Sequence, residues 1–161
     1  EMTVWIPEVL SAATPLPAPT IASRAKVTVS AECKGAPETV NDQQCPAKSS
    51  SAEFGHIHWW PKKATNEWVQ YDFAKAEAVS VIDVFWFDDE DLNAGCRVPK
   101  SWKLLVKKGN RWVPVKAKGT YDTKKDQYNR LEFETVITTG LRLEIRQPDD
   151  FSTGVQEWIV K

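Results

Sequence analysis

The 161 residues are enough for one domain with a sizeable hydrophobic core, and the formal net charge of −1 gives no general attraction to nucleic acid or to an anionic membrane. No apolar run approaches the roughly 20 residues that span a bilayer. No signal peptide is visible at the start of the chain. Eight tryptophans are many for this length. Most must be core residues, but tryptophan also stacks on sugars and at interfaces.

Residues 1–25 differ in composition from the remainder of the chain. Four prolines fall among them, at positions 7, 15, 17 and 19, and residues 11–14 read Ser-Ala-Ala-Thr. Such a composition favours extended and poorly packed chain. We therefore interpret residues 1–25 as a linker, or as the tail of a preceding domain, and residues 26–161 as the folded domain.

Alternation of polar and apolar residues predicts a series of strands along this domain. The first covers residues 26–30, and residues 67–73 (Glu-Trp-Val-Gln-Tyr-Asp-Phe) form a central strand with one buried side. Aromatic and β-branched residues dominate it, and they suit a pleated, half-buried surface. Further strands are predicted over residues 78–87, 101–106, 111–115, 130–137, 141–146 and 155–160.

The connections between these strands are turns and two long irregular segments. Residues 108–110 read as a tight hairpin turn, whereas residues 32–58 and the segment after residue 87 are longer loops. No stretch shows a helical period with caps. About eight strands joined in this way predict an all-β sandwich.

No catalytic motif is present. The sequence has no G-x-S-x-G, H-E-x-x-H, P-loop or dinucleotide-binding glycine pattern. A pair such as Asp88 and Asp89 says little about glycoside hydrolysis in a chain with 22 acidic residues. His56 and His58 would share one face of a strand, but no third metal ligand is visible beside them. We therefore expect them to line a pocket or a polar surface.

Asp42 suggests a cation site in the first long loop. It lies in Val-Asn-Asp-Gln, with Ser49 downstream and Glu157 near the end of the chain. Calcium binds six to eight oxygens, many of them backbone carbonyls of irregular chain. The alternative is an ordinary Asx turn, which Asn-Asp sequences form readily.

The three cysteines leave two arrangements open. Cys33, Cys45 and Cys96 do not have zinc-site spacing. Cys33 and Cys45 flank one loop and would form a disulfide if their Cβ atoms approached to about 4 Å. Cys96 would then remain a buried thiol behind Arg97. The other arrangement is three reduced thiols.

Residues 26–161 contain a set of motifs in a characteristic order: Val40-Asn41-Asp42, Pro46, Ser49-Ser50, Trp59-Trp60, Glu67 to Phe73, Val84 to Asp89, Cys96 to Trp102, Trp112, and Val155 to Trp158. As a set, these motifs resemble the galactose-binding-like superfamily, the discoidin or coagulation-factor type C fold. More narrowly, the chain is similar to C-terminal carbohydrate-binding modules of bacterial glycoside hydrolases, including β-L-arabinofuranosidase-type enzymes.

This resemblance implies an eight-stranded antiparallel jelly-roll sandwich without catalytic activity of its own. It also implies a structural calcium ion held by the loop of Asp42 and by Glu157, and we expect Ser49 to contribute a further carbonyl. One residue departs from the family pattern, because the usual Asp-Gly is Asp42-Gln43 here. The implied partners are a glycan and a catalytic domain of the same chain, and the implied location is outside the cytoplasm of a bacterium. We expect a monomer that binds neither nucleic acid nor a membrane.

Sugar binding is expected where the loop 54–61 meets the loop 88–97. One indole would stack on a sugar face, while Arg97, a carboxylate and an imidazole would bind hydroxyl groups. One of the two adjacent tryptophans is expected in the core. Arg97 has an alternative role, since an ion pair with a neighbouring carboxylate would make it a brace of the loop. The candidate residues are His56, His58, Trp59, Trp60, Asp88, Asp89, Asn93 and Arg97.

Two other functions compete with glycan binding. The domain would be a structural module if it docked on a catalytic domain and bound no glycan, because fold alone does not fix function. Adhesion to phospholipid, as in animal members of the superfamily, needs exposed apolar residues with basic neighbours. The acidic run at residues 88–91 argues against that target.

Overall fold

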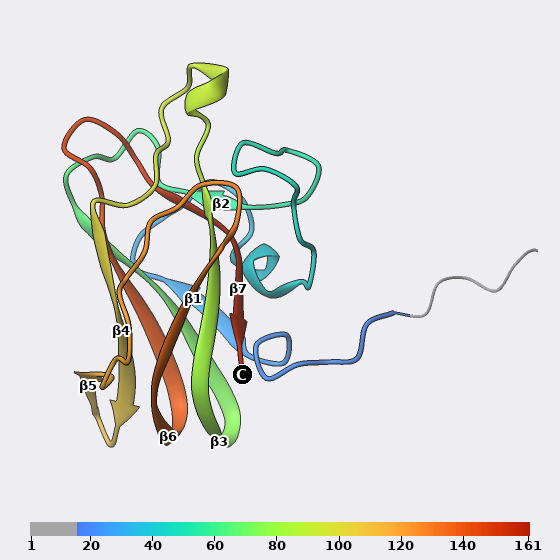
Figure 1. Cartoon of the computed structure of the whole chain (residues 1–161), viewed down its shortest axis with the longest axis vertical. Helices are drawn as coiled ribbons and strands as arrows, with labels where there is room; N and C mark the ends of the chain where they lie inside the picture. Colours follow the sequence, from blue (N-terminus) through green and yellow to red (C-terminus); the bar gives the residue numbers. More distant parts are fainter. Residues whose placement is uncertain (1–15) are drawn as a thin grey trace, which may run out of the picture.

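The central strand is longer than the sequence pattern predicts. In the computed structural model, which describes residues 16–161, the predicted strands 67–73 and 78–87 are one continuous strand, β3 (Asn66–Phe87). The predicted strands 130–137 and 141–146 are likewise one strand, β6 (Tyr128–Arg146). β3 and β6 pair antiparallel along almost their whole length, with a register shift between Asp72 and Glu77. Both strands bend at this point, at the lower end of the molecule in Figure 1.

The two bent strands pass from one layer of a sandwich to the other. The first layer contains β1 (Lys26–Val29), the first arm of β3, the second arm of β6, β4 (Ser101–Lys108) and β5 (Arg111–Pro114). The second layer contains the other two arms together with β7 (Gly154–Val160) and β2 (Ile57–His58). All these pairings are antiparallel, which confirms the predicted all-β fold.

The described residues contain no α-helix. Two short 3-10 helices, η1 (Pro37–Asn41) and η2 (Glu90–Leu92), lie in the two long loops. No helix among them is long and apolar enough to cross a membrane. The predicted hairpin is confirmed, since β4 and β5 pair directly across residues 109–110.

Inward-facing residues of both layers form the core, as the alternation predicts. In the first arm of β3, Val69, Tyr71 and Phe73 are buried, while the residues between them are partly exposed. The Tyr71 ring stacks on Trp158 of β7 at a centroid distance of 3.8 Å. Its hydroxyl donates to the carbonyl of Trp158 at 2.7 Å and lies 3.2 Å from the carbonyl of Val40. This one side chain therefore joins the two layers to the first long loop.

The packed structure begins before the first strand. Ala22 is buried, and the Asn41 side-chain amide donates to the carbonyls of Ala22 and Ala25. The segment predicted as a linker, residues 1–25, thus includes a turn at residues 21–24 that contacts the domain. Its first fifteen residues lie outside the described part of the chain.

The two ends of the sandwich differ. The loops that precede and follow β2, η2 with its flanking chain, and the β6–β7 connection gather at the upper end in Figure 1. We call this the loop end. The chain enters near residue 20 and leaves at residue 161 well below it (Figure 1). Pro17 and Thr20 line the same pocket as Ile159, so the two ends of the described chain are neighbours.

Replacing Tyr71 by phenylalanine should destabilise the domain by about 1–3 kcal/mol, because two buried carbonyls would lose a hydroxyl partner while the ring stacking persists. This corresponds to a melting temperature lower by roughly 2–4 °C per kcal/mol at this chain size. Tyr121→Phe is the matched control, because within residues 16–161 the Tyr121 hydroxyl makes one bond, which it accepts at 3.4 Å from the amide of Leu104. Equal losses in the two variants would contradict the role given to Tyr71.

Candidate functional site

The two histidines lie on one aromatic surface at the loop end. β2 pairs with the start of β7, with His58 opposite Gly154. The rings of His56 and His58 stack on Phe87, at centroid distances of 3.8 and 5.6 Å. Burial lowers the pKa of each imidazole, and for His58 the neighbouring His56 lowers it further. Both rings are therefore neutral near pH 7, which suits hydrogen bonding to hydroxyl groups.

The adjacent tryptophans have different environments. Trp59 is 2% exposed and belongs to the core, whereas Trp60 is 39% exposed. The Trp60 ring lies directly over Gly95, where any added Cβ would overlap it. The Lys63 ammonium lies 5.1 Å from the centre of the same ring. Trp60 is therefore the indole available for stacking, and the loop 88–97 determines where it lies.

A shallow pocket of about 380 Å³ adjoins this indole. Its lining mixes aromatic and charged side chains from the first long loop and from the chain after β2. Lys34 is tied to β2 by a bridge to His58, so the pocket wall is held next to the histidine pair. The lining residues are Glu32, Cys33, Lys34, Trp59, Trp60, Pro61 and Lys62.

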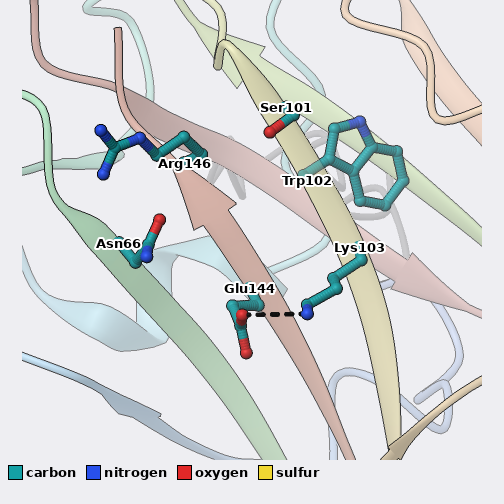
Figure 2. A pocket seen from close by; sticks show the side chains of 6 residues that line it. All are labelled: Asn66, Ser101, Trp102, Lys103, Glu144 and Arg146. Carbon is teal, nitrogen blue, oxygen red and sulfur yellow. Dashed lines mark ion pairs between the residues drawn. The ribbon is translucent and has the colours of Figure 1, made fainter. Parts of the chain in front are cut away.

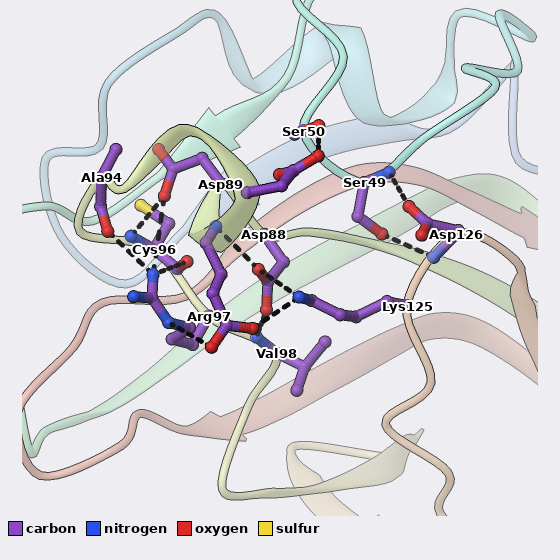
Figure 3. A network of polar contacts seen from close by, with 12 residues as sticks. Ser49, Ser50, Asp88, Asp89, Ala94, Cys96, Arg97, Val98, Lys125 and Asp126 are labelled. Atoms are coloured by element: carbon purple, nitrogen blue, oxygen red, sulfur yellow. Dashed lines mark hydrogen bonds and ion pairs between the residues drawn. The ribbon is translucent and has the colours of Figure 1, made fainter.

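The acidic turn after β3 is a structural network (Figure 3). Asp88 is 1% exposed and accepts hydrogen bonds from the amides of Glu90 and Val98, with the Lys125 ammonium 3.4 Å away. Asp89 accepts from the amide of Cys96 at 2.7 Å. Asp88 therefore organises the loop from inside, and only Asp89 of this pair borders the histidines.

Arg97 is also part of the loop's internal structure. One guanidinium nitrogen donates to the carbonyls of Ala94 and Cys96, both at 2.8 Å (Figure 3). The side chain is 18% exposed and lies within 3.9 Å of Asp89. Its Cζ is 4.1 Å from the centre of the Phe151 ring. The geometry thus favours the alternative role, in which Arg97 braces the loop instead of reaching a ligand.

The structure brings only some of the candidate residues to a common surface. His56, His58 and Asp89 lie near one another at the loop end, and the Trp60 amide donates to Nδ1 of His58 at 3.2 Å. Exposed Asn93 caps η2 with left-handed backbone (φ 55°). Trp59, Asp88 and Arg97 support that surface from below. Lys34, Lys63 and Phe151 were not identified from the sequence. Phe151 follows two aspartates in the β6–β7 connection, and its placement beside Arg97 has no local signal.

A second cluster joins the loop of Asp42 to β7. Glu157 is 2% exposed, and one of its carboxylate oxygens accepts from the amide of Gln43 at 3.2 Å. The other oxygen is buried and has no partner among the described residues. Burial, reinforced by the nearby Asp42 carboxylate, raises the pKa of Glu157 to about 9. A cation would balance this pair of carboxylates, and so would a proton on Glu157.

The backbone at Gln43 takes the conformation that glycine would favour. Its φ is 65°, so glutamine occupies the left-handed region despite its side chain. Asp42 also forms the Asx turn considered above, because its carboxylate accepts from the amide of Gln44 at 2.9 Å. This loop therefore adopts a left-handed backbone conformation without a glycine.

Ser49 does not belong to that cluster. Its amide and hydroxyl both bond to Asp126, and its carbonyl accepts from the amide of Asp88 and from the Gln156 side chain. The expected calcium ligand is thus fully used in fixing the loop against the acidic turn. Among residues 16–161, no three His, Cys, Asp or Glu side chains converge as a metal-binding group. An ion here would rely on Asp42, Glu157 and loop carbonyls.

Of the two cysteine arrangements left open by the sequence, the structure has the one without a bridge between Cys33 and Cys45. All three cysteines are free thiols. Cys33 lies beside Lys34 in the pocket near Trp60, whereas Cys45 lines a different pocket with Tyr128 and Ile159. Cys96 is buried as expected, and burial raises the pKa of its thiol to about 12.

Solved carbohydrate-binding modules share this fold. The module CpGH89CBM32-5 from Clostridium perfringens, in complex with GalNAc-β-1,3-galactose, superposes with a TM-score of 0.66 at 13% identity over 88% of this chain and 99% of that one. The family 32 module of C. perfringens NanJ, in complex with galactose, gives 0.66 at 14% identity over 87% and 96%. Chitosan-binding module 1 of a Paenibacillus chitosanase/glucanase gives 0.60 at 14% over 89% and 99%.

Sequence comparisons add no family assignment. No protein-family model matches the chain. No curated protein matches it either. The likeness to the solved modules, at 13–14% identity, shows a shared antiparallel β-sandwich fold.

Acidification should destabilise the loop end through the two histidines. Their folded-state pKa values lie below the ordinary value of 6.5, so the unfolded chain takes up protons first as the pH falls. Stability conferred by the neutral rings is present above pH 6.5 and is lost as the pH falls below it. The double variant His56→Gln/His58→Gln should show a flatter decline in melting temperature between pH 7 and 5 than the wild type. Parallel declines would contradict this assignment.

Proposed function

We propose that this domain is a non-catalytic carbohydrate-binding module whose loop end binds a glycan. The observation that carries the proposal is the exposed Trp60, fixed over Gly95 beside two neutral histidines. An immobilised indole offers a flat apolar surface to the C–H face of a sugar, and neighbouring polar groups can bind its hydroxyls. Modules of the same fold bind galactose-containing and chitosan ligands, which supports this class of ligand.

The binding surface differs from the eight candidates expected from the sequence. We assign direct contact to Trp60, His56 and His58, with Asn93 at the rim. Asp89, 14% exposed and bonded to the amide of Cys96, positions these residues together with Arg97, Asp88 and Trp59. Lys34 and Lys63 are additional donors beside the indole. Because the contact is shallow, the dissociation constant should be on the order of 0.1–1 mM.

The proposal includes the context of the domain. Accessory modules of this fold would keep a catalytic domain of the same chain near its polysaccharide. We propose a bacterial glycoside hydrolase acting outside the cytoplasm as the parent, with the β-L-arabinofuranosidase type as the finer assignment. The competing function is a docking module without a ligand.

Removal of the indole tests the site. Trp60→Ala should abolish measurable binding to the best ligand of a glycan array, titrated by calorimetry, whereas Trp60→Phe should retain part of it. Gly95→Ala should weaken binding as well, because the added methyl displaces the ring. Melting temperatures of the variants provide the control for folding.

Two outcomes would overturn this site. Normal binding by Trp60→Ala would place it elsewhere. Absence of any glycan binding, together with loss of parent-enzyme stability on truncation of the domain, would favour the docking module.

We further propose that a calcium ion occupies the Asp42–Glu157 cluster and stabilises the first long loop. The orphaned buried oxygen of Glu157 and the second carboxylate beside it support a hard cation. Its role would be structural, because the cluster faces η1 and β7 and not the loop end.

Chelation should then lower the melting temperature. At a free calcium concentration 100 times the dissociation constant, the ion would add about 2.7 kcal/mol of stability. Glu157→Gln should remove the calcium-dependent shift while preserving the shape of the side chain. If Glu157 is instead simply protonated, excess chelator would leave the melting curve unchanged and Glu157→Gln would be close to neutral.

A further inference from the structure

The outer face of the first layer carries an ordered set of aromatic and charged side chains. Strand register places them in rows across β3, β6 and β4: Asn66, Arg146 and Ser101 in one row, Trp68, Glu144 and Lys103 in the next, and Gln70, Arg142 and Leu105 in the third. Trp112 of β5 lies opposite Lys107 beyond them. We call this surface the outer face; it is separate from the loop end.

A cation held between two indoles fixes the centre of the outer face. The Cζ of Arg142 lies 4.2 Å from the centre of the Trp68 ring and 4.4 Å from that of Trp112. The Gln70 carbonyl oxygen accepts from two guanidinium nitrogens, at 3.0 and 2.6 Å. Trp112 closely covers Gly140, where an added Cβ would come within 3.0 Å of the ring. The aromatic planes are therefore immobilised before any ligand arrives.

A polar hollow of about 310 Å³ lies over the two rows next to that of Gln70 and Arg142. Figure 2 shows the side chains that line it. Lys103 and Glu144 form an ion pair across it at 3.3 Å. The guanidinium of Arg146 and the side-chain amide of Asn66 also line it, and neither has a hydrogen-bond or ion-pair partner among the described residues. The hollow thus offers a cation, an amide and a carboxylate to a ligand.

The outer face carries more positive than negative side chains, although the formal net charge of the whole chain is −1. Lys26 and Asp72 also lie on the outer face. They are paired with each other, and Asp72 is paired with Gly140, in the row after that of Gln70 and Arg142. Its cations outnumber its carboxylates by five to two: Lys26, Lys103, Lys107, Arg142 and Arg146 against Asp72 and Glu144.

We propose that the outer face binds a linear polysaccharide that carries carboxylate groups, laid across the strands. Arg146 would bind a carboxylate, Trp68 would offer a flat surface to a sugar ring, and Glu144 with Asn66 would bind hydroxyls. A single-stranded nucleic acid also suits aromatic and cationic side chains, but Glu144 and Asp72 would repel its phosphates. An acidic sugar supplies a carboxylate for Arg146 and hydroxyl donors for Glu144 and Asn66.

This site is independent of the proposed loop-end site. Trp68 and Arg146 lie on strands of the first layer, whereas Trp60 and the histidines lie around β2 and the loops. Variants of Trp60 and of Arg146 therefore distinguish failure of one proposal from failure of the other.

The test uses polygalacturonate as the probe, by affinity electrophoresis and calorimetry on the full chain without added calcium. The wild type should bind it at low salt, and methyl esterification of the polymer should weaken binding at least tenfold. Arg146→Ala and Trp68→Ala should each weaken binding at least tenfold, while Arg146→Lys should keep part of it. Trp60→Ala is the matched control and should leave the affinity unchanged.

Four results would overturn the proposal. One is absence of binding by the folded wild type, and another is equal affinity for the acidic and the esterified polymer. The third is loss of binding in Trp60→Ala with normal binding in Arg146→Ala, which would move the site to the loop end. Stronger binding of a single-stranded oligonucleotide than of polygalacturonate would likewise reject it. Melting temperatures identify any variant that fails to fold. If Trp68→Ala unfolds, Arg146→Ala still decides the test, because Arg146 is a half-buried surface residue.

Discussion

The continuous antiparallel pairing of β3 with β6 is the constraint on which the rest of the structure depends. Because both strands bend together between the two layers, each layer inherits one β3–β6 pair and extends outward from it. Thr138, at the bend of β6, donates its hydroxyl to the carbonyl of Lys107 and accepts from the amide of Gly140. The two layers are therefore joined at the bend, by the continuous strands and by hydrogen bonds. At the opposite end, the loop end, irregular segments connect the strands.

Buried polar groups limit the conformational freedom of the segments at the loop end. Asp88 is almost inaccessible, yet it accepts two backbone amides and faces Lys125, so its charge is compensated inside the loop. Arg97 and Ser49 act in the same way on neighbouring segments. Hydrogen bonds to charged groups are stronger than neutral ones, and they give an irregular segment a single conformation. The exposed side chains then have defined positions without a regular strand beneath them.

The sequence predicted those features that depend on local periodicity. Alternation in residues 67–73 identified both the strand and its buried side, and the Gly-Asn turn identified the β4–β5 hairpin. It did not show that β3 continues through Ala74, Lys75 and Ala76, because that stretch is exposed and lies in the register shift between Asp72 and Glu77, where no cross-strand partner is paired with it. For Arg97 it left a ligand contact and a loop brace both open. The bonds of Ser49 to Asp126 and the separation of Cys33 from Cys45 were beyond it, since each depends on surroundings that only the folded chain brings together. For the candidate site, the sequence predicted which types of residue gather there. It did not predict which of them would contact a ligand and which would support the loops.

The position of the chain ends has a consequence for how such a domain would operate in an array. The chain enters near residue 20 and leaves at residue 161, with both points together and away from the loop end (Figure 1). Modules attached at either point would leave the loop end unobstructed. In a chain of successive copies, each loop end could therefore orient independently of its neighbours. Two weak contacts on one polymer would then act with an effective concentration set by linker length, so that avidity could exceed either affinity by about 10²–10⁴.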